Sequence, residues 1–181
     1  PTGADDIKTS AIWSILFALI AIALYILIRF RNIAFSAGAV VGLVHDVLFI
    51  LGIYSIFYSI MPFSLEIDQS FIAAILTVIG YSINDTVVVF DRIRENVGLY
   101  PKRALNELIN MSVNSTLSRT FSTSFSTALP LLAIFIFGGE TIRGFVFAIL
   151  LGVIVGTYST IFIASPIAYD IQQKQAKKAQ K

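Results

Sequence analysis

Five long apolar runs, separated by short polar connections, constrain the fold of this chain more than any other feature. Each run has about the 20 residues that an α-helix needs to cross a bilayer. The strands of a β-barrel would give short alternating runs instead. The pattern therefore predicts an all-α, polytopic membrane helix bundle with five transmembrane helices. We expect the spans at residues 10–28, 36–60, 71–91, 119–137 and 144–168.

The composition agrees with a membrane protein. Of the 181 residues, 56% are hydrophobic and only 13% are charged, and the mean hydropathy is +0.82. Soluble domains are usually about a quarter charged. The chain has no cysteine, which excludes disulfides, thiolate metal sites and cysteine nucleophiles. Its basic residues lie just outside the apolar runs, as in a topology signal and unlike a nucleic-acid-binding surface.

The basic residues also predict the orientation of the chain in the membrane. Eleven Lys and Arg residues lie after the first span, around the third connection and in the tail, against two on the opposite side. Because basic residues favour the cytoplasmic side, we expect a cytoplasmic C-terminus and a periplasmic N-terminus. An external N-terminus without a signal peptide leads us to expect an earlier helix and a periplasmic domain that ends within residues 1–8. The transmembrane domain would then cover 9–169.

Two segments outside the spans carry further expectations. The connection that begins at Pro101 has a partial apolar face over residues 101–118. It predicts a short amphipathic helix at the cytoplasmic interface, with an ordinary solvated helix as the alternative. Residues 170–181 form a basic cytoplasmic tail that we expect to be disordered and close to anionic lipid headgroups.

A carboxylate inside the third span is the most informative polar residue. Asp85 precedes the boundary residue Arg92 by two helical turns, which places it about 10 Å inside the cytoplasmic boundary. Thr77, Tyr81, Asp85 and Arg92 share one stripe of the helix, and they are flanked by Ser82 and Asn84. Intramembrane ionisable groups are costly and normally face the bundle interior, so this stripe is expected to face protein or water.

The fourth span carries a matching stripe at the same helical spacing, formed by Ser115, Arg119, Ser122 and Ser126. We expect the two stripes to face each other, with Arg119 able to approach Asp85. Spacing alone leaves two roles open. The pair either transfers protons or holds the helices together.

The second span contains His45 and Asp46. Neighbouring residues on a helix point about 100° apart, so these two need not share a site. A metal site here lacks a third ligand at helical spacing, and no metal is expected. Serine-hydrolase chemistry is disfavoured because the chain has no Gly-x-Ser-x-Gly motif.

Small residues predict where helices pack closely. Two pairs have the G-x-x-x-G spacing that lets neighbouring backbones approach. They are Gly38 with Gly42, and Gly152 with Gly156.

Four segments resemble the SecF members of the SecD/SecF family of protein-export membrane proteins, and together they span nearly the whole chain. The most specific is GYSINDTVVVFDRIREN at residues 80–96. The others are GLVHDVLFILGIYSIF at 42–57, TLSRTFSTS at 116–124 and FGGETIRGFVFAILLGVIVGTYSTIFIASP at 137–166. The family resembles the resistance–nodulation–division (RND) transporters. The resemblance implies half of an RND-like transmembrane domain that lacks its first helix and periplasmic domain.

The resemblance also implies a function in the bacterial cytoplasmic (inner) membrane. It points to a non-enzymatic part of the SecDF complex, in which proton flow drives late preprotein translocation on the periplasmic side. The implied partners are SecD, separate or fused, the SecYEG translocon and the preprotein. No cofactor is implied other than protons as the coupling ion. The family's intramembrane Asp falls on Asp85 and the Arg of the next span on Arg119, with a weaker correspondence at Asp46.

Simple electrostatics gives a mechanism for such coupling. A buried carboxylate favours its neutral form, and an adjacent guanidinium favours the charged form. Helix movement that joins or separates Asp85 and Arg119 would therefore release or load a proton. Two alternatives stay open, namely half of an RND-type small-molecule or lipid exporter and a non-transporting scaffold for the translocon.

Overall fold

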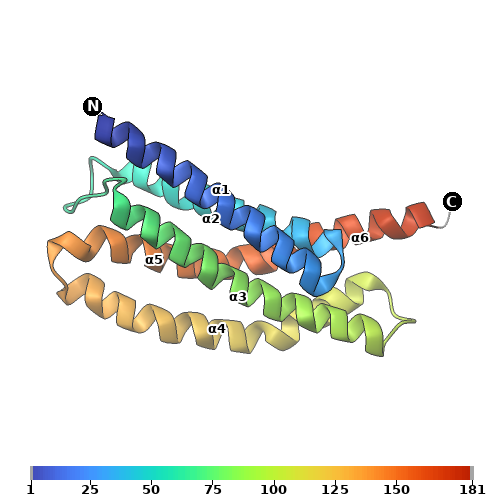
Figure 1. Cartoon of the computed structure of the whole chain (residues 1–181). Helices are drawn as coiled ribbons and strands as arrows, with labels where there is room; N and C mark the ends of the chain where they lie inside the picture. Colours follow the sequence, from blue (N-terminus) through green and yellow to red (C-terminus); the bar gives the residue numbers. More distant parts are fainter. Residues whose placement is uncertain (1, 180–181) are drawn as a thin grey trace.

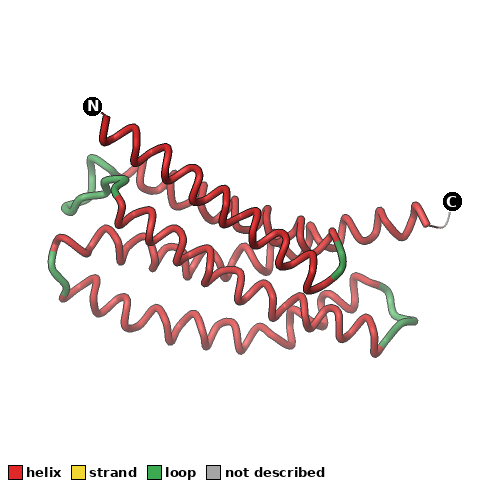
Figure 2. The backbone as a smooth tube through the Cα atoms, viewed as in Figure 1, coloured by secondary structure: helices red, strands yellow, loops and turns green. Residues whose placement is uncertain are grey.

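The computed structural model describes residues 2–179, which form helices joined by short loops (Figure 1 and Figure 2). Five helical segments are long and apolar enough to cross a membrane, and this confirms the predicted all-α bundle. The helices are α1 (Thr2–Phe30), α2 (Ile33–Phe57), α3 (Gln69–Leu99), α4 (Leu105–Phe137), α5 (Glu140–Ser159), the π-helix η1 (Thr160–Ala164) and α6 (Ser165–Ala179).

Polar residues at the helix ends explain where two spans begin. Asn32 accepts a 2.9 Å hydrogen bond from the backbone N–H of Ala34 at the start of α2. Asp68 accepts a 2.8 Å bond from the N–H of Phe71 at the start of α3. Asn and Asp are favoured at this position because they satisfy N–H groups that have no partner within the helix.

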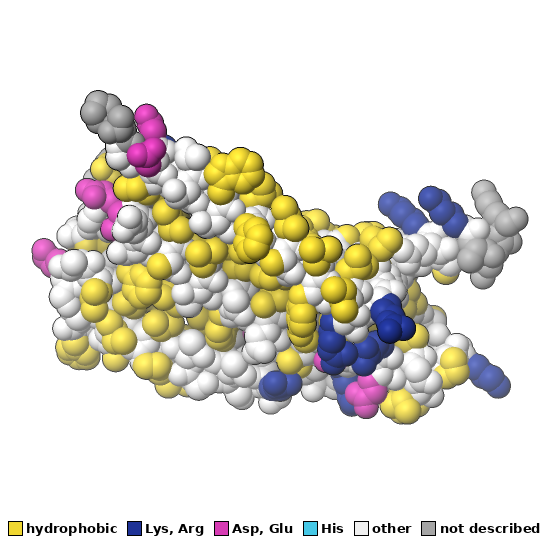
Figure 3. All heavy atoms as spheres, in the orientation of Figure 1, with side chains coloured by type: hydrophobic (Ala, Val, Ile, Leu, Met, Phe, Trp, Pro, Cys, Tyr) yellow, Lys and Arg dark blue, Asp and Glu magenta, His cyan; other side chains and the backbone are white. Residues whose placement is uncertain are grey.

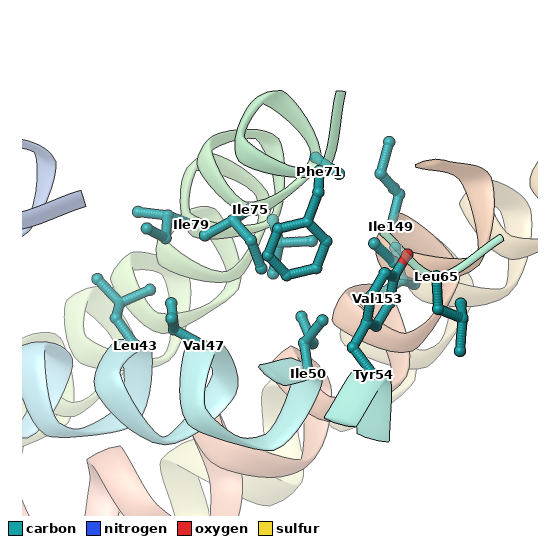
Figure 4. Packing of buried hydrophobic residues seen from close by; sticks show 13 residues of the cluster. Leu43, Val47, Ile50, Tyr54, Leu65, Phe71, Ile75, Ile79, Ile149 and Val153 are labelled. Atoms are coloured by element: carbon teal, nitrogen blue, oxygen red, sulfur yellow. The ribbon is translucent and has the colours of Figure 1, made fainter. Parts of the chain in front are cut away.

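The core of the bundle lies among α2, α3 and α5, while α1 and α4 pack at its periphery. Figure 4 shows the largest cluster of buried side chains, which these three central helices build with Leu65 of the 58–68 loop. Within it, Tyr54 packs against Phe71 with ring centroids 4.5 Å apart and donates a hydrogen bond to the carbonyl of Gly144. This core fixes the relative positions of the three helices that carry the buried polar groups.

The four glycines of the G-x-x-x-G pairs lie against other helices. A Cβ added to Gly38 would lie 2.5 Å from the carbonyl oxygen of Ala164, and one added to Gly156 would lie 3.0 Å from Ser82. At Gly152 an added Cβ would overlap the side chain of Val78. Gly42 is less crowded, with the Cβ of Ala164 at 3.4 Å from the added atom. The absence of a side chain at these positions lets α5 and η1 approach α2 and α3 closely.

The short interfacial helix expected over residues 101–118 does not exist as a separate element. Residues 105–118 are instead the first part of α4, which continues unbroken to Phe137. Two buried contacts explain the difference. Leu108 and Ile109 are buried in the protein, and Ser112 accepts a 2.7 Å hydrogen bond from Asn96 of α3. This segment therefore packs on the bundle and does not lie alone on the membrane surface.

The tail also differs from expectation. Residues 170–179 continue α6 as a helix, which extends beyond the rest of the bundle (Figure 1), and residues 180 and 181 lie outside the described part. Lys and Arg side chains gather toward this end of the molecule, and most of the visible acidic side chains lie toward the opposite end (Figure 3). The charge segregation predicted from the sequence is thus present in the folded chain.

Candidate functional site

Asp46 is the most deeply buried ionisable residue of the described chain. Its side chain has no exposed surface, and its Oδ2 accepts hydrogen bonds from the hydroxyls of Ser82 on α3, at 2.7 Å, and Ser159 on α5, at 2.9 Å. His45 Nδ1 lies 3.2 Å from Oδ1. His45 and Asp46 therefore do meet, although their helical spacing did not require it.

Asp85 lies one turn beyond Ser82 on α3 and is 5% exposed. Its Oδ2 is buried and has no hydrogen-bond partner among the described residues. Buried polar atoms of native proteins are nearly always hydrogen-bonded, and exceptions call for an explanation. Asp46 and Asp85 are thus two buried carboxylates with different surroundings, one held by hydroxyls and one with a free oxygen.

Arg119 of α4, the predicted partner of Asp85, is exposed. The ion pairs found within 4.0 Å in the described chain do not include these two residues. The predicted Asp85–Arg119 ion pair is therefore not formed among the described residues.

Other members of the two predicted stripes make one contact across the α3–α4 interface. Arg92 Nε donates a 3.2 Å hydrogen bond to the hydroxyl of Ser115. Tyr81 instead donates to Ser124 at 3.3 Å, and Ser124 also shares a hydrogen bond with Thr157 of α5. Tyr81 therefore belongs to a polar contact of three helices that the predicted stripe of α4 did not include.

The remaining predicted residues of the stripes do not converge on Asp85. Thr77 donates to the carbonyl of Ala73 within α3, and its side chain is exposed, as are Asn84, Ser122 and Ser126. The face of α4 that packs against the bundle carries Ser112, Thr116 and Thr120, all of which are buried.

Sequence reasoning missed the polar residues of the last span. Thr157, Ser159, Thr160 and Ser165 are all buried, and the Thr160 hydroxyl lies 2.9 Å from that of Thr86 on α3. The available signal was the concentration of four hydroxyl residues within nine positions of an otherwise apolar run. Together with Asp46, Ser82 and Thr86, they form a set of buried polar groups on α2, α3, α5, η1 and α6.

The fold and these residues define a class of protein. The chain is a polytopic helical membrane protein that seals two carboxylates and a set of hydroxyls inside its bundle. Residues 1–174 match the family described as "Protein export membrane protein SecD/SecF, C-terminal". The chain belongs to this family, and it is a multi-pass protein of the inner membrane.

Individual relatives and a solved structure agree with this assignment. The chain is 53% identical to the protein translocase subunit SecF of Rhodothermus marinus over 98% of its own length and 58% of the relative's length. It is 47% identical to SecF of Rhodobacter capsulatus over 92% of its length and 48% of the relative's. It thus spans about half of each relative. A crystal structure of SecDF in a super-membrane-facing form matches with a TM-score of 0.83 at 39% identity, over 96% of this chain and 23% of that chain.

Proposed function

We propose that this chain is the membrane-embedded part of a SecF-type subunit that works with SecD at the SecYEG translocon. In this proposal, proton flow through the membrane domain drives the late stage of preprotein translocation on the periplasmic side. The chain acts as a non-enzymatic transport subunit, with protons as the coupling ion and no other cofactor. Asp85 and Arg119 carry the proton step, and Asp46 supports it.

The single observation that carries this proposal is the free Oδ2 of Asp85. An ionisable group within a membrane costs several kcal/mol and marks a proton or ion pathway more often than a structural contact. A carboxylate that served only to hold helices together would have its oxygens hydrogen-bonded, as those of Asp46 are. A carboxyl group with one unpartnered buried oxygen is suited to taking up and giving away a proton.

In this proposal, Arg119 provides the positive charge that controls the release and uptake of the proton by Asp85. A guanidinium that approaches Asp85 favours the carboxylate form, so the proton leaves, and withdrawal of Arg119 favours reloading. A hydrogen bond to a charged group contributes about 1.5–3 kcal/mol. A membrane potential of 100 mV supplies about 2.3 kcal/mol per proton. The two energies are of the same order, so making and breaking this contact is matched to the available driving force.

Exposed polar residues on the two helices support a partner within the membrane. Asn84 and Thr77 on α3, and Arg119, Ser122 and Ser126 on α4, are all exposed in the isolated chain. Polar side chains in transmembrane helices normally face protein or water. A neighbouring helical bundle of SecD would cover them, and its own acidic or hydroxyl groups could complete the surroundings of Asp85 and Arg119.

The proposed orientation follows from the charge segregation. The end of the bundle that carries α6 and the clustered Lys and Arg residues lies in the cytoplasm, following the excess of basic residues on that side. The end with Glu66, Asp68 and Glu140 lies in the periplasm, where the preprotein emerges.

An export assay tests this function. Full-length SecF carrying Asp85→Asn would be produced together with SecD in cells depleted of the native pair. Release of a secreted protein would then be measured with the proton gradient present and after its collapse. Gradient-dependent release is expected to be lost in Asp85→Asn. It should be kept in Asp91→Asn, which changes an exposed carboxylate of the same helix that pairs with Arg29. Unchanged gradient-dependent release in Asp85→Asn would exclude Asp85 as the proton carrier.

A further inference from the structure

The buried carboxylate of Asp46 joins three helices at one point. Its Oδ2 accepts hydrogen bonds from Ser82 of α3 and Ser159 of α5. His45 is the one titratable group in hydrogen-bond or ion-pair contact with Asp46 among the described residues, and 32% of its side chain is exposed. From α3 and α5 the hydroxyls of Ser82 and Ser159 bond to the carboxylate, and the ion pairs of the described residues join no group of α1, η1 or α6 to it. His45 therefore links Asp46 to the surface of the bundle.

The Ser159 hydroxyl lies within hydrogen-bonding distance of two acceptors. It lies 2.9 Å from Asp46 Oδ2 and 3.1 Å from the carbonyl oxygen of Gly156 in its own helix. A hydrogen bond to an ionised acceptor is roughly twice as strong as one to a neutral acceptor. The charged carboxylate therefore holds Ser159, whereas a protonated carboxyl group leaves the Gly156 carbonyl as a competitive partner. The hydrogen-bond partner of this single hydroxyl on α5 can thus change with the charge of Asp46.

The π-helix η1 begins directly after Ser159. Its backbone bond runs from the N–H of Ser165 to the carbonyl of Thr160, and the Ser165 hydroxyl donates to the same carbonyl at 2.8 Å. Pro166, directly after Ser165, has no N–H to donate within the helix. π-Helical turns are rare and frequently occur at functional sites. Here the first residue of the turn, Thr160, is also tied to Thr86 of α3.

The π-helix forms one wall of a groove of about 350 Å³ between α4 and the start of α6. Its lining includes Ile109 and Val113 of α4, and Ile161, Phe162, Ser165 and Pro166 of the opposite wall. Residues of the π-helical turn therefore also line this groove. A change from π to α geometry at η1 would rotate α6 and alter the groove.

We propose that Asp46 is a second proton-binding site and that Ser159 is the positioning residue that transmits its charge to η1 and to the groove between α4 and α6. The inference rests on the proposed function, because it assumes that protons reach the membrane interior. One proton binds to a carboxylate oxygen of Asp46 and makes it neutral. The Ser159 hydroxyl then donates to the Gly156 carbonyl in place of Asp46. Only hydrogen bonds and one proton change, and η1 and α6 move as a result.

Spin labels on α4 and α6, the helices that flank the groove, test this inference in the full-length protein together with its proposed SecD partner. Glu107→Cys on α4 and Ala176→Cys on α6 change exposed residues, and the 181 residues contain no other cysteine. The distance between the labels is expected to change with pH. This change should be abolished by Asp46→Asn, which keeps the size of the side chain but cannot ionise, and by Ser159→Ala.

A matched control removes a hydroxyl that bonds only within its own helix. Thr127 of α4 donates to the carbonyl of Thr123, and Thr127→Ala should leave the pH dependence of the distance intact. The inference is overturned if the distance between the labels does not change with pH in the unsubstituted complex. It is also overturned if this distance changes equally with pH in Asp46→Asn. The result is independent of the export assay on Asp85→Asn. A positive export result with an unresponsive groove would retain the function and reject the role of Ser159.

Discussion

The hydroxyl of Ser82 donates a 2.7 Å hydrogen bond to Asp46 Oδ2, one helical turn before Asp85 on the same helix. The two buried carboxylates are thus connected through a single turn of α3 but differ in their partners. Two serines hold Asp46, whereas one oxygen of Asp85 has no donor within residues 2–179. This difference predicts that the two residues contribute unequally to stability.

Replacement of the two carboxylates should separate stability from transport. Asp46→Ala leaves the hydroxyl of Ser82 without its acceptor and is expected to lower the free energy of unfolding by about 1–3 kcal/mol. Asp85→Asn removes a charge that lacks a full set of hydrogen bonds, so it should leave stability unchanged or raise it. Thermal unfolding of the purified variants in detergent measures both effects. An equal loss of stability in the two variants would contradict the assignment of different roles.

Arg119→Gln distinguishes a transport pair from a structural pair. Breaking a buried ion pair costs about 3–5 kcal/mol, but Arg119 is exposed and makes no ion pair with Asp85 in the structure. We therefore expect a change in unfolding free energy within about 0.5 kcal/mol, as for surface substitutions, together with loss of gradient-dependent export. A large loss of stability would favour the scaffold interpretation.

Close packing of α5 on α3 can be tested at one glycine. A Cβ added by Gly152→Ala would lie 2.8 Å from the Cβ of Val78, so no rotation of the valine relieves the overlap. The substitution should destabilise the bundle by about 1–3 kcal/mol. The double variant with Val78→Ala should recover part of the loss.

Gly52→Ala is the matched control for this substitution. Nothing lies within 4 Å of a Cβ added at Gly52, and alanine favours a helix over glycine by about 1 kcal/mol. This variant should be as stable as the unsubstituted protein or more so. Equal destabilisation by Gly52→Ala and Gly152→Ala would show that helix contact is not the cause.

The orientation can be measured by labelling introduced cysteines. Lys177→Cys on α6 should react with a membrane-impermeant maleimide only in inside-out vesicles, and Glu66→Cys in the 58–68 loop only in intact spheroplasts. The chain offers a clean background because it has no cysteine of its own. The reverse pattern of labelling would invert the proposed topology.

The five spans were predictable because apolar runs of sufficient length have few alternatives in a membrane. Their ends were less predictable. Hydropathy ends a span where polar residues begin, but the backbone of α4 begins at Leu105, 14 residues before the predicted start at 119. The early part of α4 packs on the bundle, where Leu108 and Ile109 are buried and Asn96 donates from α3 to Ser112.

The candidate site was predictable only in part. Asp85, Arg119 and Asp46 stand out because charged groups are rare in apolar runs. Helical spacing, however, predicts only the face of the helix on which a residue lies and not the residue that it contacts. The facing residue of α4 is Ser124, which bonds to Tyr81, and not the predicted Ser122 or Ser126. The ligands of Asp46 come from α3 and α5, 36 and 113 residues away in the sequence, and only the three-dimensional packing brings them together.

Proton flux through reconstituted protein tests the central claim most directly. The full-length protein, together with its proposed SecD partner, would be placed in liposomes that contain a pH-sensitive dye, and the internal pH would be followed after a proton gradient and a potential are imposed. Unsubstituted protein and Asp91→Asn are predicted to conduct protons, whereas Asp85→Asn is predicted to conduct none above protein-free liposomes. Full proton flux through Asp85→Asn would contradict the account.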